Sequence, residues 1–141
     1  MNTDRHKSEI DRVTEKIIGG VFTVGNRLGC GFLEKIYENA LVIELRKVGL
    51  RVPQQQLMEV RYDDVVVGTY VADLVVEGVV LLEIKAVKFF DEIHTGQCLN
   101  YLKATRLVLC LLINFGRPRV DIKRVILTTE RGVAEKRSGT L

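Results

Sequence analysis

Three charged residues interrupt two apolar segments in the middle of the chain. Glu83 and Lys85 are separated by Ile84 and follow the apolar run at 79–82. Because side chains on a β-strand alternate between its two faces, Glu83 and Lys85 would point the same way. Asp73 lies in the preceding apolar segment, and the loop between the segments decides where its carboxylate points. A three-residue loop at 77–79 puts Asp73 directly across from Glu83, whereas a two-residue turn at 77–78 puts the two on opposite faces.

If the two carboxylates share a face, a cation would be needed to offset their mutual repulsion. At a separation of about 4 Å they would repel by roughly 4 kcal/mol at an effective dielectric constant near 20, and Lys85 offsets only part of this. Mg²⁺ prefers hard oxygen ligands and usually takes one or two carboxylates, together with waters and phosphate oxygens. The backbone carbonyl of Ile84 could add a ligand. Lys85 would then lie near a metal-bound water, where it could orient that water or lower its pKa. This is chemistry suited to hydrolysing a phosphodiester.

Hydrophobic periodicity predicts the elements that would position these residues. Apolar residues spaced by three or four positions indicate a helix over about 5–27 and another over about 33–48. Apolar runs indicate strands that include 57–62, 65–76, 79–87, 106–115 and 120–127, and 91–104 is typical of a helix. This order, α-α-β-β-β-α-β-β, predicts an α/β fold in which helices flank a mixed central β-sheet.

Size and composition are those of a globular protein. The chain has 141 residues, of which 47% are hydrophobic and 28% charged, so we expect a single domain over 1–130 and a flexible C-terminal tail over 131–141. The net charge of +3 is compatible with a polyanionic partner but does not establish one. The polar start lacks the apolar segment of a signal peptide, and the three cysteines form no CxxC pair. We therefore expect a reduced, cytoplasmic protein with no membrane segment.

The order of the charged residues resembles a known signature. Asp73, followed after a hairpin by Glu83-Ile84-Lys85, is similar to the D…(D/E)xK signature of the PD-(D/E)xK nuclease superfamily. Gly31, Glu34 and Tyr37 resemble the GxxExxY motif of a family of small bacterial and archaeal proteins assigned to that superfamily. Gln97 and Tyr101 follow in the same order. Ala72 stands where many members have proline. The resemblance covers roughly residues 10–127 and implies a restriction-endonuclease-like core.

The resemblance also implies roles for individual residues. Asp73 and Glu83 would hold Mg²⁺, with Mn²⁺ as a possible substitute, and Glu34 would contribute to the metal shell or bind water. Lys85 would assist the attacking water. Gln97 and Tyr101, four residues apart on one helix face, would line the site. The resemblance thus implies a Mg²⁺-dependent nuclease that uses metal-activated water, with DNA favoured over RNA as its substrate, and it is compatible with a homodimer.

Each of these residues also has an ordinary structural explanation. Glu83 and Lys85 could form a same-face surface ion pair, which contributes roughly 0–1 kcal/mol. Glu34 could simply favour the N-terminal end of a helix dipole. Gln97 could be a surface residue, and Tyr37 and Tyr101 could be half-buried aromatic residues.

Two other functions stay open at this point. A non-catalytic nucleic-acid-binding or assembly module could retain the nuclease fold without turnover, and a small-molecule site in the same cleft is a weaker third possibility. Titration with Mg²⁺ separates the first of these from a nuclease, because retained acids that take up no metal favour the binding module.

Overall fold

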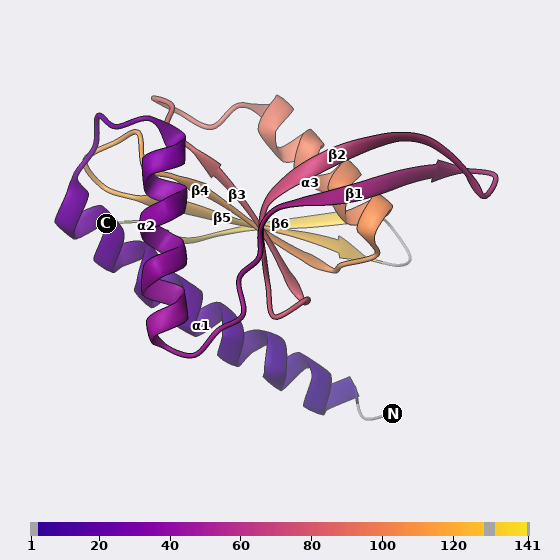
Figure 1. The fold of residues 1–141 in the computed structure, drawn as a ribbon, viewed down its shortest axis with the longest axis horizontal. Coiled ribbons are helices and arrows are strands. Elements are labelled where there is room, and N and C mark those ends of the chain that lie inside the picture. The colour runs from indigo at the N-terminus through magenta and orange to yellow at the C-terminus, as the bar shows by residue number, and fades with distance from the viewer. Residues whose placement is uncertain (1–2, 129–131, 141) are drawn as a thin grey trace.

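The central feature is one mixed β-sheet with helices on both faces (Figure 1). The computed structural model describes residues 3–128 and 132–140, and side chains from 8 to 127. The helices are α1 (Thr3–Leu28), α2 (Glu34–Lys47) and α3 (Glu92–Thr105). The strands are β1 (Gln54–Tyr62), β2 (Val65–Val76), β3 (Val80–Lys85), β4 (Leu109–Asn114), β5 (Asp121–Thr128) and β6 (Gly132–Thr140). The predicted α/β fold class and the order of its elements are confirmed, with one strand added at the end.

The strands lie in the sheet in their order along the chain, from β1 to β6. All neighbouring pairs are antiparallel except β3 and β4, which are parallel. Two parallel neighbours need a crossover connection, and α3 supplies it. Every residue of β4 is buried, as expected for a continuous apolar run with layers on both faces.

Helices α1 and α2 cover one face of the sheet, and α3 covers the other (Figure 1). The apolar stripes of α1 and α2 pack against side chains that include Leu74, Leu82 and Leu111. On the opposite face, Cys98 and Leu102 of α3 pack against the alternate residues of β3 and β4. Neighbouring strand residues therefore belong to two separate cores, and Glu83 lies on the face that α3 covers.

The loop between β2 and β3 has the length that brings the acidic residues together. Val76 pairs with Val80, so the loop consists of residues 77–79. Its backbone N–H at Val79 donates to the carbonyl of Val76 at 3.0 Å, and both Glu77 and Gly78 have positive φ. Positive φ at successive turn residues suits the right-handed twist of a hairpin. The three-residue alternative of the sequence analysis is thereby confirmed.

The end of the chain differs from the sequence-based expectation. Residues 132–140, which we expected in a flexible tail, form β6 and pair antiparallel with β5. An unpaired β5 would expose a row of backbone donors and acceptors, and β6 satisfies them. Backbone pairing of this kind needs no apolar pattern in the added strand, which is why periodicity did not indicate it.

Candidate active site

Asp73 lies where β2 and β3 separate. The ladder between these strands ends at Leu74 and Leu82, one step before the position where Asp73 faces Glu83. There the Asp73 Oδ2 accepts a hydrogen bond from the backbone N–H of Ile84 at 2.9 Å. The carboxylate thus takes the place of a backbone acceptor and fixes itself in the fork between the strands. The residues of β2 that precede Asp73 in the sequence pair with β1 and no longer with β3, so the sheet opens between β2 and β3 at this end.

Glu83 is a buried acid beside Asp73. Only 6% of its surface is exposed, and the Asp73 carboxylate is close enough to influence its charge. Burial, followed by the nearby Asp73 carboxylate, raises the pKa of Glu83 to about 9, while the Lys85 charge acts in the opposite direction. The second oxygen, Oε1, is buried and has no hydrogen-bond partner among the described residues. An unsatisfied buried oxygen of this kind costs about 1–3 kcal/mol, so it suggests a ligand that the protein binds.

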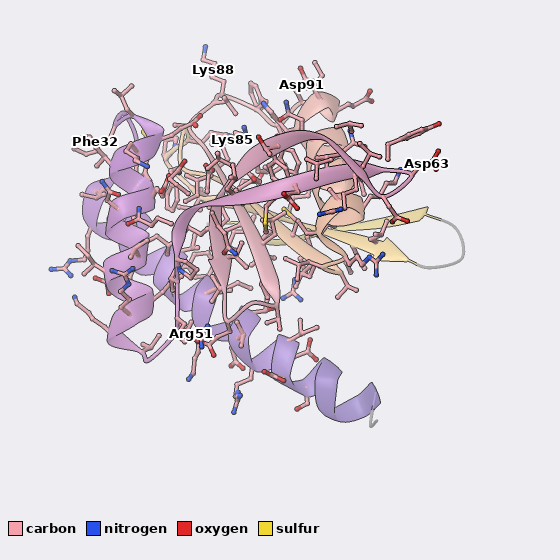
Figure 2. All side chains as sticks on the ribbon, turned by 45° about the vertical axis from the view of Figure 1, so that its right-hand side comes forward. Phe32, Arg51, Asp63, Lys85, Lys88 and Asp91 are labelled. Carbon is pink, nitrogen blue, oxygen red and sulfur yellow. The ribbon has the colours of Figure 1, made fainter. Side chains whose placement is uncertain are left out.

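Lys85 is the last residue of β3 and shares its face with Glu83. Its side chain is half-buried, and no hydrogen bond joins it to another residue in the described part of the chain. Figure 2 shows Lys85 between Phe32, just before α2, and Asp91, just before α3. The beginnings of both helices and the end of β3 therefore lie at the same end of the molecule (Figures 1 and 2).

Tyr101 lies close to the acids, but Gln97 does not point into the core. Tyr101 is half-buried, and burial and the Glu83 charge raise its pKa. Gln97, on the same helix, is exposed. Of the two predicted α3 residues, the structure therefore brings only Tyr101 into the electrostatic environment of Glu83.

Tyr70, which the sequence analysis missed, belongs to the same group. Its ring stacks on that of Tyr101 with centroids 3.9 Å apart and an interplanar angle of 8°. Burial and the Glu83 charge raise its pKa, and its buried hydroxyl has no partner within the described residues. The only available signal was its position three residues before Asp73 on a predicted strand, which is too weak to identify a site residue.

Glu34 is not joined to the acid pair in this structure. It is exposed at the first position of α2, one helical turn before Tyr37, where the buried residues of this helix begin. No group of three or more His, Cys, Asp or Glu side chains able to hold a metal occurs among the described residues. Tyr37 is a core residue, fully buried rather than half-buried, and its hydroxyl donates to the carbonyl of Gly29 at 2.7 Å.

The acid of α2 that faces the sheet is Glu38, which the sequence analysis also missed. It is 4% exposed, and its carboxylate accepts hydrogen bonds from the side chains of Gln54, Gln55 and Lys35 at 2.9–3.2 Å. These partners satisfy a charge that would otherwise be costly to bury. In the sequence, Glu38 looks like any charged residue on an amphipathic helix, so nothing marked it as buried.

Glu38 holds an unusual turn of the backbone next to the site. Gln55 has a φ of 52°, a conformation that disfavours residues other than glycine. The pairing of Gln54 with Leu74 and of Gln56 with Ala72 places Gln55 opposite Asp73. Glu38 binds the Gln55 amide with both carboxylate oxygens. We infer that α2 supports the fork at Asp73 through this contact rather than through Glu34.

A divalent cation fits the acid pair on the chemistry of its donors. Asp73 and Glu83 supply hard carboxylate oxygens, one of them buried without a partner. Mg²⁺ commonly uses only one or two carboxylates, so a third acid is not required. A positive charge there would also relieve the repulsion that raises the pKa of Glu83.

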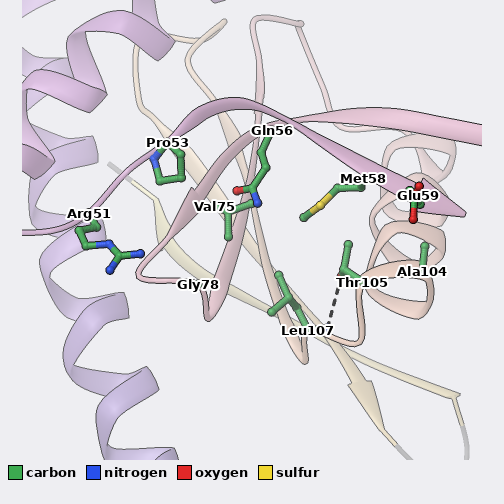
Figure 3. Close-up of a pocket in the computed structure, with 10 residues that line it drawn as sticks. All are labelled: Arg51, Pro53, Gln56, Met58, Glu59, Val75, Gly78, Ala104, Thr105 and Leu107. Carbon is green, nitrogen blue, oxygen red and sulfur yellow. Dashed lines mark hydrogen bonds between the residues drawn. The ribbon is translucent and has the colours of Figure 1, made fainter.

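A separate cavity of about 300 Å³ lies away from these acids (Figure 3). Its lining includes Gly78, in the loop between β2 and β3, and Thr105, at the end of α3. Lys85 and Asp91 lie at the other ends of β3 and α3, so this cavity is not part of the candidate site.

Comparison with known proteins identifies a family. Residues 11–125 match the family model of the PD-(D/E)XK nuclease superfamily. The matched region contains every candidate site residue named above. No curated protein and no solved structure matches the chain. Within the described part of the chain, none of the helices is long and apolar enough to span a membrane.

Proposed function

Because the chain belongs to the PD-(D/E)XK nuclease superfamily, we propose that it is a Mg²⁺-dependent nuclease that hydrolyses phosphodiester bonds in DNA. One observation carries the proposal. Asp73 and Glu83 bring two carboxyl groups together from adjacent strands, one Glu83 oxygen is buried without a partner among the described residues, and Lys85 follows on the same face. Within the superfamily, Gly31, Glu34 and Tyr37 favour the GxxExxY family. A homodimer and a cytoplasmic location stay predictions.

In the proposed mechanism, Asp73 and Glu83 hold the cation, which when bound would neutralise charge on the phosphate and polarise its oxygens. The hydrogen bond from the backbone of Ile84 keeps the Asp73 carboxylate fixed for this role. The ammonium group of Lys85 donates a hydrogen bond to the attacking water and orients it toward the phosphorus. Tyr101 lines the approach from α3, and Gln97, exposed on the same helix, contacts the phosphates of the bound strand.

A cleavage assay with Mg²⁺ or Mn²⁺ tests the proposal on single-stranded, duplex and branched DNA and on RNA. Lys85→Ala should lower the rate by about 10²–10⁴-fold, the range typical of a group that positions or transfers a proton. Lys47→Ala is a matched control, because Lys47 lies at the end of α2 and pairs with Glu44 on the surface. Identical rates for the wild type and Lys85→Ala on every substrate would contradict the catalytic role.

Isothermal titration with Mg²⁺ provides a second readout that does not depend on turnover. Asp73→Asn and Glu83→Gln should each abolish metal uptake, while Lys85→Ala should retain it. If the wild type binds nucleic acid but takes up no metal in its presence, the non-catalytic binding module is the better description.

A further inference from the structure

Two exposed phenylalanine side chains lie in the loops at the site end of the molecule. Phe32 is 44% exposed in the loop before α2, and Phe89 is 66% exposed in the loop after β3. Single exposed apolar residues are common and need no explanation. Two exposed aromatic rings at the same end of the molecule as a candidate active site are different, because solvent-facing rings next to cations are what nucleic-acid-binding proteins use to stack bases.

A chain of contacts fixes the Phe32 loop to the end of β3. The Phe32 ring meets the edge of Tyr37 at a centroid distance of 6.1 Å, and Tyr37 stacks on Phe115 at 4.6 Å. The backbone N–H of Phe115 donates to the carbonyl of Lys85 at 2.9 Å. The backbone N–H of Phe32 also donates to the Tyr37 hydroxyl at 3.2 Å. Phe32 is therefore linked to the end of β3 through Tyr37 and Phe115.

The loop that carries Phe89 is fixed to the same end of the sheet. The Asn114 side chain, at the end of β4, accepts from the backbone N–H of Val87 at 3.0 Å and donates to its carbonyl at 2.8 Å. Gly116 packs so closely that a Cβ there would lie 2.4 Å from the Val87 backbone. Phe89 follows two residues later, so its position is tied to β3 and β4 rather than free.

Cations accompany the rings. The guanidinium carbon of Arg117 lies 4.9 Å from the centroid of the Phe89 ring, a cation–π arrangement that covers one ring face. Lys88 is exposed in the same loop, and Figure 2 shows its side chain pointing outward above Lys85. Asp91 and Glu92 are exposed at the beginning of α3 and would repel phosphate. The charge distribution therefore favours a strand whose base stacks on the face of Phe89 that Arg117 leaves open, with its phosphates toward Arg117 and Lys88.

We propose that this rim, defined by Phe32, Lys88, Phe89 and Arg117, binds unpaired nucleotides, so that the substrate is single-stranded nucleic acid or carries an unpaired stretch. The inference rests on the proposed function and names its substrate class. In a duplex, neighbouring base pairs cover the faces of each base, whereas an unpaired base can stack on an exposed ring. Glu83 is recessed, with 6% of its surface exposed, so a strand must bend to bring a phosphate to it. A single strand bends more readily than a duplex.

Equilibrium binding tests the inference without any need for cleavage. The probes are a fluorescently labelled 20-nucleotide oligothymidine and a blunt duplex of the same length, titrated in Ca²⁺ and followed by fluorescence anisotropy. The wild type should bind the single strand more tightly than the duplex. Phe89→Ala should weaken single-strand binding about five- to 150-fold, the effect expected for one stacked base. Phe89→Trp should retain it, and Phe32→Ala should also weaken it.

Leu57→Ala is the matched control, because Leu57 is similarly exposed, at 63%, on β1 of the projecting hairpin. It should leave binding unchanged, and thermal unfolding should show that all variants are folded. Tighter duplex binding, or a Phe89→Ala effect no larger than that of Leu57→Ala, overturns the rim while leaving the nuclease proposal intact. A wild type that binds neither probe but cleaves nucleic acid also overturns only the rim. If the wild type neither binds nor cleaves any nucleic acid, the rim and the nuclease proposal are both overturned.

Discussion

Replacing Glu83 with glutamine should stabilise the metal-free protein at neutral and alkaline pH. In the folded chain the acid is buried beside Asp73, and its pKa is raised to about 9 from an ordinary value of 4.5. The folded state therefore keeps a proton that the unfolded state releases. Stability is fully present below the unfolded pKa and is lost as the pH rises through the folded pKa. Glutamine resembles the protonated acid and cannot lose this proton.

The size of the effect follows from the gap between the two pKa values. Each unit of difference corresponds to about 1.4 kcal/mol. The free energy of unfolding of the wild type should therefore fall by about 3 kcal/mol between pH 4.5 and pH 7, and by roughly 6 kcal/mol by pH 9. Other groups titrate as well, so the relevant quantity is the difference between wild type and Glu83→Gln, in which their contributions cancel.

Urea unfolding in EDTA at pH 5, 6, 7, 8 and 9 measures this difference. It should be small at pH 5 and grow steadily in favour of Glu83→Gln. The control Glu59→Gln, on exposed β1, should follow the wild type at every pH. Mg²⁺ should raise the stability of the wild type, increasingly at higher pH because it takes the place of the proton, and should not affect Glu83→Gln. A difference that does not change with pH, or a less stable Glu83→Gln at pH 8, would refute the burial argument.

Three further predictions concern the residues that support the site. Glu38→Ala should lower the free energy of unfolding by about 2–4 kcal/mol, because it removes the buried carboxylate that binds the side chains of Gln54 and Gln55. Adding Gln55→Gly should recover about 1 kcal/mol by relieving the positive φ, and no recovery in urea unfolding would argue against strain at Gln55. Gly116→Ala should cost more than about 3 kcal/mol, since its Cβ would meet the Val87 backbone at 2.4 Å, and an unchanged melting temperature would contradict this. Tyr37→Phe should lower the free energy of unfolding by about 1–2 kcal/mol, because the Phe32 amide and the Gly29 carbonyl both lose the hydroxyl as a hydrogen-bond partner. Hydrogen exchange at the Phe32 amide should become faster, and an unaffected amide would mean that the hydroxyl does not hold this loop.

Local patterns were sufficient for most of the fold. The spacing of apolar residues along α1 and α2 and the continuous run of β4 follow from the helical and strand periods, so they could be predicted to within a few residues. β6 could not, because its evidence is backbone pairing with β5. The alternation rule placed Glu83 and Lys85 on one face, but the face of Asp73 depended on a loop whose length the sequence left open.

The candidate site divides in the same way. The sequence singled out Asp73, Glu83 and Lys85 as candidates because charged residues are conspicuous within short apolar strands. Glu38 and Tyr70 were not, because their partners are distant in sequence: Glu38 is bound by glutamines 16 and 17 residues later, and Tyr70 stacks on a residue of α3. Each looked ordinary within its own element.

The amino-acid sequence alone determined which segments are helices and strands and which charged residues lie on apolar strands, because these follow from steric rules that act over a few residues. Only the tertiary structure decided that Asp73 meets Glu83, that burial raises the pKa of Glu83 and that Glu34 stands in solvent while Glu38 is buried. These properties depend on desolvation and on hydrogen bonds between distant segments, and both exist only once the helices have closed over the two faces of the sheet.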